Sequence, residues 1–178
     1  MTTLDNPTLA LALTVILRPA IQSDLPKLEW YGQYTHFRNL FRRTFREQEQ
    51  GRRVMLIADC NDFPIGHVFI QIGGGQSRLA DGNRRAYLYS LRVMEMFRGQ
   101  GIGSRLLQEA EVIAAEAGFG WTTIAAAKDN PRARQLYERS GYRVFMEDAG
   151  NWSYVDHEGR VRYVHEPCWI LEKQLRLR

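Results

Sequence analysis

The sequence predicts a mixed α/β sheet folded as a single domain that spans residues 1–178. The first observation is the length, since 178 residues are enough for one domain with a full hydrophobic core. The second is the composition, 44% hydrophobic and 25% charged, which is typical of a globular protein. The third is the order of the patterns, in which a strand, a glycine-rich loop, a helix and another strand form one crossover unit.

The first half of the chain predicts three strands and two helices. An apolar run indicates a strand at about residues 13–17, because it is too short to span a bilayer. Residues 23–26 have the cap and first-turn residues of a short helix. A longer helix is expected over residues 35–50, where phenylalanines and a leucine recur at helical spacing. Residues 54–58 and 65–72 predict two strands joined by a short turn.

The second half continues the alternation after a polar, glycine-rich segment at residues 73–85, which we expect to be a mobile loop. The next strand covers residues 86–93, with Tyr87, Tyr89, Leu91 and Val93 expected on one face. The remaining elements follow in order: an apolar helical stripe from Leu106 to Ala117 ended by Gly118, a strand at 121–126, a helix between Asn130-Pro131 and Gly141, and strands around 142–146 and 163–171.

The most informative motif is the run Arg98-Gly99-Gln100-Gly101-Ile102-Gly103, at the junction of a predicted strand and helix. Its bare backbone would let a phosphate approach several N–H groups, and the following helix adds the positive end of its dipole. A dinucleotide-binding fingerprint is excluded because Ser104 stands where its third glycine would be. A P-loop is excluded as well, since no lysine follows the run.

The charge and the cysteine content indicate the kind of partner and the cellular location, but not the substrate. The net charge of +4 and the pI near 9.3 favour anionic partners but do not require nucleic acid. Cys60 and Cys168 form neither a disulfide framework nor a metal-ligand cluster, so no metal is expected. Because the apolar run near the start lacks a preceding basic segment, we expect no signal peptide, no membrane span and a cytoplasmic location.

Two separated motifs carry a family resemblance. Leu91-Arg92-Val93 precedes Arg-x-x-Gly-x-Gly by five residues, and the segment from Asn130 to Tyr142 follows in a strand–helix–strand–helix context. The sequence here resembles the GCN5-related N-acetyltransferase (GNAT) superfamily over about residues 86–146, a third of the chain. The resemblance implies a central, mostly antiparallel mixed sheet of about seven strands, splayed at its middle and flanked by about four helices.

The resemblance also implies acetyl-CoA as cosubstrate, held between the strand that ends at Val93 and the strand at residues 121–126. The pyrophosphate would lie on the amides of the glycine loop, and the pantetheine arm would pair with the backbone near Leu91 to Val93. An asparagine and a tyrosine downstream match the family's coenzyme contact and proton donor. The implied cofactor-binding residues are Leu91, Arg92, Val93, Arg98, Gly99, Gln100, Gly101, Ile102, Gly103, Ser104, Asn130 and Tyr137.

The implied activity is transfer of an acetyl group to a primary amine by direct attack, because no cysteine lies in the matched motifs. The backbone N–H of Leu91 would stabilise the oxyanion, and Tyr137 would give a proton to the departing thiolate. Tyr87 stands where some relatives carry a glutamate base, so the base is left open. Three other side chains could order a water or take the proton: Ser90, Glu29 and His67.

Other functions compete with catalysis. A non-catalytic acyl-CoA sensor is the main alternative, and a nucleic-acid binder ranks last because no binding motif is present. The acceptor amine stays unassigned. The aromatic segment at residues 29–38, which includes Trp30, either lines the acceptor site or only covers the sheet. The resemblance leaves a homodimer open, since dimers are frequent in the family.

Overall fold

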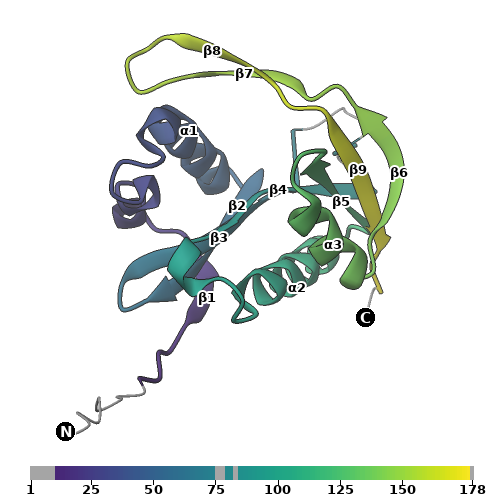
Figure 1. Ribbon diagram of the computed structural model, residues 1–178, viewed down its shortest axis with the longest axis horizontal. Coiled ribbons are helices and arrows are strands. Elements are labelled where there is room, and N and C mark those ends of the chain that lie inside the picture. The colour runs from purple at the N-terminus through teal and green to yellow at the C-terminus, as the bar shows by residue number, and fades with distance from the viewer. Residues whose placement is uncertain (1–10, 75–78, 82–83, 177–178) are drawn as a thin grey trace, which may run out of the picture.

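A seven-stranded sheet runs through the centre of the molecule (Figure 1). The computed structural model describes residues 11–74, 79–81 and 84–176. The strands of the sheet are β1 (Ile16–Pro19), β2 (Arg53–Cys60), β3 (Phe63–Gln71), β4 (Arg85–Val93), β5 (Trp121–Ala127), β6 (Arg143–Asp148) and β9 (Cys168–Gln174). Their order across the sheet is β1-β2-β3-β4-β5-β9-β6. The mixed α/β fold class that the sequence predicts is therefore confirmed.

Three α-helices cover the two faces of this sheet: α1 (Arg38–Glu49), α2 (Ile102–Glu116) and α3 (Pro131–Arg139). In Figure 1, α2 and α3 lie on one side of the sheet and α1 on the other. The fourth helix, expected at residues 23–26, is instead a pair of 3-10 turns at Gln22–Asp24 and Lys27–Glu29. No helix within the described residues combines the length and the apolar content needed to cross a bilayer.

Each face of the sheet has its own hydrophobic core. Under α2 and α3, fully buried leucines and alanines of α2, among them Leu106 and Ala110, pack on β2, β3 and β4. On the opposite face, Phe41 of α1 packs with Met55 and Phe69 in a smaller, aromatic core. The predicted helical stripe of α2 is thereby confirmed, and Gly118 ends the helix at a φ of +91°.

The sheet opens between its two central strands. β4 and β5 are the one parallel pair in the sheet, and α2 connects them. They pair only from Arg85 opposite Trp121 to Leu88 opposite Ile124. The last five residues of β4 and the last three of β5 have no register partner in each other, so the strands diverge there. The splayed sheet implied by the family resemblance is present in the structure.

A β-bulge in β4 lies just beyond the point where the strands part. Phe69 of β3 is opposite Tyr89, but His67, two residues away, is opposite Arg92, so β4 contains one extra residue. Ser90 accommodates that extra residue with a φ of +54°, in the left-handed region. A bulge bends its strand and adds local twist, which directs the end of β4 away from β5.

The bulge corrects one sequence prediction. We expected Tyr87, Tyr89, Leu91 and Val93 on a single face, as strict alternation requires. Tyr87 and Tyr89 do stack on each other, with ring centroids 5.5 Å apart, and Tyr89 packs against the α1 core. Leu91 and Val93 pack against the α2 core instead. The extra residue at Ser90 reverses the alternation, which no apolar periodicity could have indicated.

Strand predictions at both ends of the chain also need correction. The run expected as one strand at residues 163–171 is two, β8 (Val161–His165) and β9, separated at Glu166 and Pro167. Pro167 lacks an N–H for a strand ladder, and its carbonyl accepts from Lys128 instead. β7 (Asn151–Val155) was not predicted, because four of its five residues are exposed and give no alternating pattern. The first strand begins at Ile16 rather than at residue 13.

β7 and β8 form a two-stranded ribbon that arches over α1 (Figure 1). The Asn39 side chain of α1 donates to the carbonyl of Asp156, 2.6 Å away, and the Phe37 ring lies 4.9 Å from that of Tyr154. At the base of the ribbon the two backbone segments cross closely, and the N–H of Glu166 donates to the carbonyl of Gly150. The loop predicted at residues 73–85 lies partly outside the described residues.

The close crossing at Gly150 requires glycine at this position, which substitution can test. A Cβ built at this residue would lie 1.8 Å from the Glu166 carbonyl oxygen, and its φ is +63°. Gly159, in the turn of the same ribbon, has a φ of +81° but an open Cβ position. Gly159→Ala should therefore cost only the strain of a positive φ, about 1–2 kcal/mol. Gly150→Ala should cost about 1–3 kcal/mol more, measured by urea unfolding. Equal losses would contradict the close crossing.

Candidate functional site

The glycine loop is positioned by the end of β4 and the start of α2. Gly99 and Gly101 have φ values of +76° and +82°, in the left-handed region that glycine adopts without strain. A Cβ built at either residue would have no heavy atom within 4 Å, so the space above the loop is open. Gly103 is different, because its Cβ position lies 3.6 Å from Leu136 and faces α3.

The loop presents free hydrogen-bond donors to that open space. The first hydrogen bond of α2 runs from the N–H of Arg105 to the carbonyl of Gly101, at 3.0 Å. The N–H groups of Ile102, Gly103 and Ser104 precede it and have no carbonyl partner within the helix. These donors stand at the positive end of the dipole of a fifteen-residue helix. Their arrangement suits an anionic group such as a pyrophosphate.

Arg98 connects the loop to the strand. Its Nε donates to the carbonyl oxygen of Val93, 3.0 Å away. The side chain is exposed, and its terminal nitrogens have no partner among the described residues. Arg98 therefore fixes the loop against the end of β4 and keeps a positive charge beside the free N–H groups.

The end of β4 offers an unpaired backbone edge. The N–H of Met94 donates to Ile65 of β3 at 2.8 Å, so the neighbouring residue Val93 points its backbone groups to the other side. The contact between Val93 and Arg98 agrees with this direction. Regular alternation after the bulge places Leu91 on the same edge as Val93. Since β5 has diverged, this edge has no strand partner and can pair with an extended amide chain.

Tyr137 lies on the α3 side of the gap. It is 5% exposed, and burial raises the pKa of its hydroxyl to about 12. The group therefore stays protonated throughout the neutral and mildly alkaline range. Its hydroxyl has no hydrogen-bond partner within the described part of the chain. Burial, and then the neighbouring Cys168, Tyr89 and Tyr137, raise the pKa of the Tyr87 hydroxyl.

Asn130 begins α3 as the sequence predicts. Its side-chain oxygen accepts a hydrogen bond from the N–H of Ala133 at 3.1 Å, and Pro131 follows at the first helical position. The residue is exposed, and the NH₂ group of its side chain has no partner among the residues described. The cap and a contact with a ligand are thus compatible.

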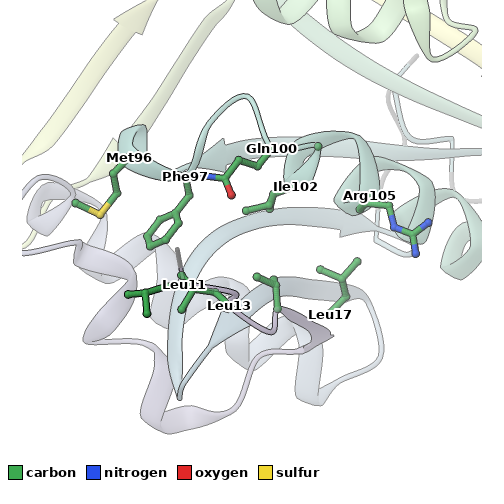
Figure 2. A pocket seen from close by; sticks show the side chains of 10 residues that line it. Leu11, Leu13, Leu17, Met96, Phe97, Gln100, Ile102 and Arg105 are labelled. Atoms are coloured by element: carbon green, nitrogen blue, oxygen red, sulfur yellow. The ribbon is translucent and has the colours of Figure 1, made fainter. Parts of the chain in front are cut away.

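A cavity of about 510 Å³ lies against the glycine loop (Figure 2). Leu11, Leu13 and Leu17 approach it from the N-terminal segment, facing Phe97 and Ile102. Gln100 and Gly101 of the loop contribute to its wall as well. Its described lining residues include none from β5 or α3, so this cavity is separate from the gap that Tyr137 borders.

Comparison with known proteins assigns the chain to a family. The model of the acetyltransferase (GNAT) family matches residues 19–142, well over half of the chain. This chain belongs to the GNAT family. The expectation drawn from the motifs is therefore confirmed, and the family match extends well beyond the third of the chain that carried the resemblance.

The curated relatives match a part of this GNAT chain. Thialysine N-epsilon-acetyltransferases from Bos taurus and Mus musculus are 33% and 31% identical over 78 residues. In both, the matched segment is 44% of this chain and 45% of the relative, so the chain spans under half the length of these relatives.

Solved GNAT structures share the fold over nearly the whole chain. Arabidopsis thaliana NAA60 in complex with acetyl-CoA has a TM-score of 0.68 at 21% identity, covering 90% of this chain and 98% of that one. PaiA N-acetyltransferase from Thermoplasma acidophilum in complex with coenzyme A has a TM-score of 0.67 at 18% identity, covering 90% and 99%. At these identities the likeness establishes the fold.

The candidates for a catalytic base differ in how the GNAT fold places them. Glu29 is held by Arg38 at 2.6 Å and by Thr35 at 3.0 Å, and Arg38 lowers the pKa of its carboxyl group. His67 is fully buried, and burial lowers its pKa well below the usual range. Ser90 occupies the bulge itself. Neither Glu29 nor His67 is free to reach an amine in the gap, so the base stays open.

The aromatic segment at residues 29–38 divides into two parts. Trp30 is 3% exposed and donates its indole N–H to the carbonyl of Pro64 at 2.8 Å, so it covers the sheet. Tyr34 and Phe37 instead lie against the guanidinium of Arg92. Sequence reasoning assigned Arg92 only a backbone role. The signal available was a charged residue between two apolar residues, Leu91 and Val93, in a predicted strand.

No metal-binding cluster is found among the described side chains. Within residues 11–74, 79–81 and 84–176, no group of three histidine, cysteine, aspartate or glutamate side chains is placed to hold a metal ion.

Because the space above Gly101 is open, a side chain placed there should weaken coenzyme A binding without a clash inside the protein. Gly101→Ala puts a methyl group where a pyrophosphate would approach the loop, so coenzyme A affinity should fall about tenfold or more. Gly118→Ala is the matched control, since Gly118 ends the same helix at a similar φ and is equally open. Calorimetric titration should show unchanged affinity for the control. Equal affinity in both variants would contradict a coenzyme site on this loop.

Proposed function

We propose that the protein transfers an acetyl group from acetyl-CoA directly to a primary amine. The observation that carries the proposal is the opening between β4 and β5, which joins an unpaired strand edge, free helix N–H groups and an unpartnered tyrosine. Acetyl-CoA supplies a thioester whose carbonyl carbon an amine can attack.

Each part of the opening has a role suited to that molecule. The N–H groups of residues 102–104, with Arg98 beside them, hold the pyrophosphate. The free edge of β4 at Val93 pairs with the amides of the pantetheine arm as an added strand would. The side-chain amide of Asn130 is free to contact the coenzyme from the start of α3.

Two groups then act on the reacting atoms. The N–H of Leu91 donates to the thioester oxygen as negative charge develops on it. Tyr137 gives its proton to the sulfur when the carbon–sulfur bond breaks, and the proton that the amine loses on becoming an amide passes through solvent to reprotonate Tyr137. Because burial raises the pKa of Tyr137 to about 12, the proton is present at neutral pH.

Direct attack is favoured over an acetyl-enzyme. Cys60 and Cys168 are both buried, and neither lies in the glycine loop or in α3. Burial raises the pKa of the Cys168 thiol, which leaves little thiolate to act as a nucleophile. The two free thiols also support our proposal of a cytoplasmic location.

The proposed activity is tested with purified protein, acetyl-CoA and single amines. The amine set includes thialysine and peptides with a free N-terminal alanine, because a curated relative is named for thialysine and fold neighbours are named for alanine and for the alpha-amino group of a protein. Lysine is added as the carbon analogue of thialysine. We expect release of coenzyme A thiol together with a mass gain of one acetyl group on the amine. Coenzyme binding without transfer to any amine would favour the non-catalytic sensor and overturn the proposal.

Tyr137→Phe tests the proton donor. It should lower kcat by about 10²–10⁴-fold and leave coenzyme A affinity nearly unchanged, because the ring remains and only the proton is lost. Tyr142→Phe is the control, since Tyr142 is equally buried, lies 6.2 Å away ring to ring, and hydrogen-bonds Thr122. That variant should lose some stability and keep its kcat. Unchanged turnover in Tyr137→Phe would remove the acid role.

A further inference from the structure

Arg92 projects from β4 on the face opposite to the glycine loop. Its neighbours Leu91 and Val93 pack toward α2, so the side chain between them emerges on the α1 side. There the guanidinium carbon lies 4.8 Å from the centre of the Tyr34 ring and 5.2 Å from that of Phe37. The Tyr154 ring of the ribbon packs on Phe37 at 4.9 Å and closes the cluster from above.

This guanidinium lacks the counter-charge that comparable arginines have. Every other half-buried arginine among the described residues forms an ion pair with a carboxylate: Arg18, Arg38, Arg53, Arg85 and Arg134. Arg92 forms none with any described residue. Burial is the main cause that lowers its pKa, and the attraction of Tyr34 and Glu166 offsets that effect only in part.

The described ionisable groups around Arg92 do not form an ion pair with it. The Tyr34 side chain, whose ring centre lies 4.8 Å from the guanidinium carbon, contributes a hydroxyl and not a carboxylate. Glu166 attracts it only at longer range from the exposed base of the ribbon. Burial and the charge of Arg92 both lower the pKa values of His36 and His67, so these histidines stay neutral beside it. The described residues therefore leave this half-buried, aromatic-walled guanidinium without a carboxylate partner.

The position of Arg92 relative to the proposed chemistry indicates which anion. The glycine loop and α3 bring acetyl-CoA to one face of the opening, which leaves the opposite face for the acceptor. Arg92 is next to Leu91, whose N–H we propose as the oxyanion donor. A group bound by the Arg92 side chain would therefore lie close to the thioester, on the face left for the acceptor. That group would belong to the molecule that attacks the thioester. A single guanidinium balances one carboxylate, whereas a phosphate would bring about 1.5–2 negative charges.

We infer that the acceptor amine carries a carboxylate and that Arg92 binds it. The inference rests on the proposed acetyl transfer and deepens it by naming the acceptor class, an amino-carboxylate. The planar guanidinium donates two parallel hydrogen bonds to the carboxylate oxygens. Tyr34 and Phe37 hold it in that orientation, and the rings contact the carbon chain between the acceptor's carboxylate and its amine.

The test compares matched amines that differ only in this charge. Glycine, 4-aminobutyrate and lysine are each paired with their carboxamides, and peptides that begin with Glu are paired with peptides that begin with Gln. We expect kcat/KM to favour the carboxylate by about 10- to 100-fold in the pair whose spacing fits. Arg92→Met, which keeps the apolar stem, should reduce the ratio to near one, and Arg92→Lys should leave a weak preference.

Arg43→Met is the control, because Arg43 is exposed on α1 and forms no ion pair with the described residues. It should keep the full preference. Equal rates for both members of every pair, or a preference unchanged in Arg92→Met, would overturn the inference while the proposed activity stands. If no amine is acetylated, titration of the same pairs into the coenzyme A complex decides: the carboxylates should bind more tightly, and only when Arg92 is present. Equal binding would overturn the inference.

Discussion

The limited pairing of β4 with β5 is the constraint on which the rest of the structure depends. Four residue pairs hold the two strands together, and the bulge at Ser90 then turns β4 away. A sheet interior normally satisfies every backbone group through its neighbours. Here the end of β4 keeps a free edge within the molecule, beside the glycine loop and α3. We propose a coenzyme site in this opening because the unpaired backbone groups of β4 can form hydrogen bonds with a ligand.

The same bulge places different groups on the two faces of the sheet. It directs Leu91 and Val93 toward α2 and sends Arg92 toward α1 and the ribbon. One side thus gathers helix N–H groups and Tyr137, which suit a coenzyme with a pyrophosphate and a leaving thiolate. The other side gathers a guanidinium and aromatic rings, which suit the acceptor. A strand without the extra residue would have put these groups on the wrong faces.

Burial has opposite consequences for the two ionisable groups at the centre. For Tyr137 it raises the pKa to about 12 and keeps the hydroxyl protonated at neutral pH, as the proposed proton donor requires. For Arg92 it disfavours the charge, which forms no ion pair among the described residues and which the carboxylate of the proposed acceptor would stabilise. The neutral state of one group and the disfavoured charge of the other both follow from the low-dielectric layers that α1, α3 and the ribbon build around the opening.

The sequence by itself determined the glycine loop, the stripe of α2, the cap at Asn130 and the family, because each depends on residues close together in the chain. Helical spacing, glycine positions and cap chemistry act locally, so a single sequence reports them. It did not reveal the bulge at Ser90, the exposed strand β7 or the surroundings of Arg92. Those depend on pairing with β3, on the close crossing at Gly150 and on rings from residues 34–37 and 152–154, which only the tertiary structure brings together.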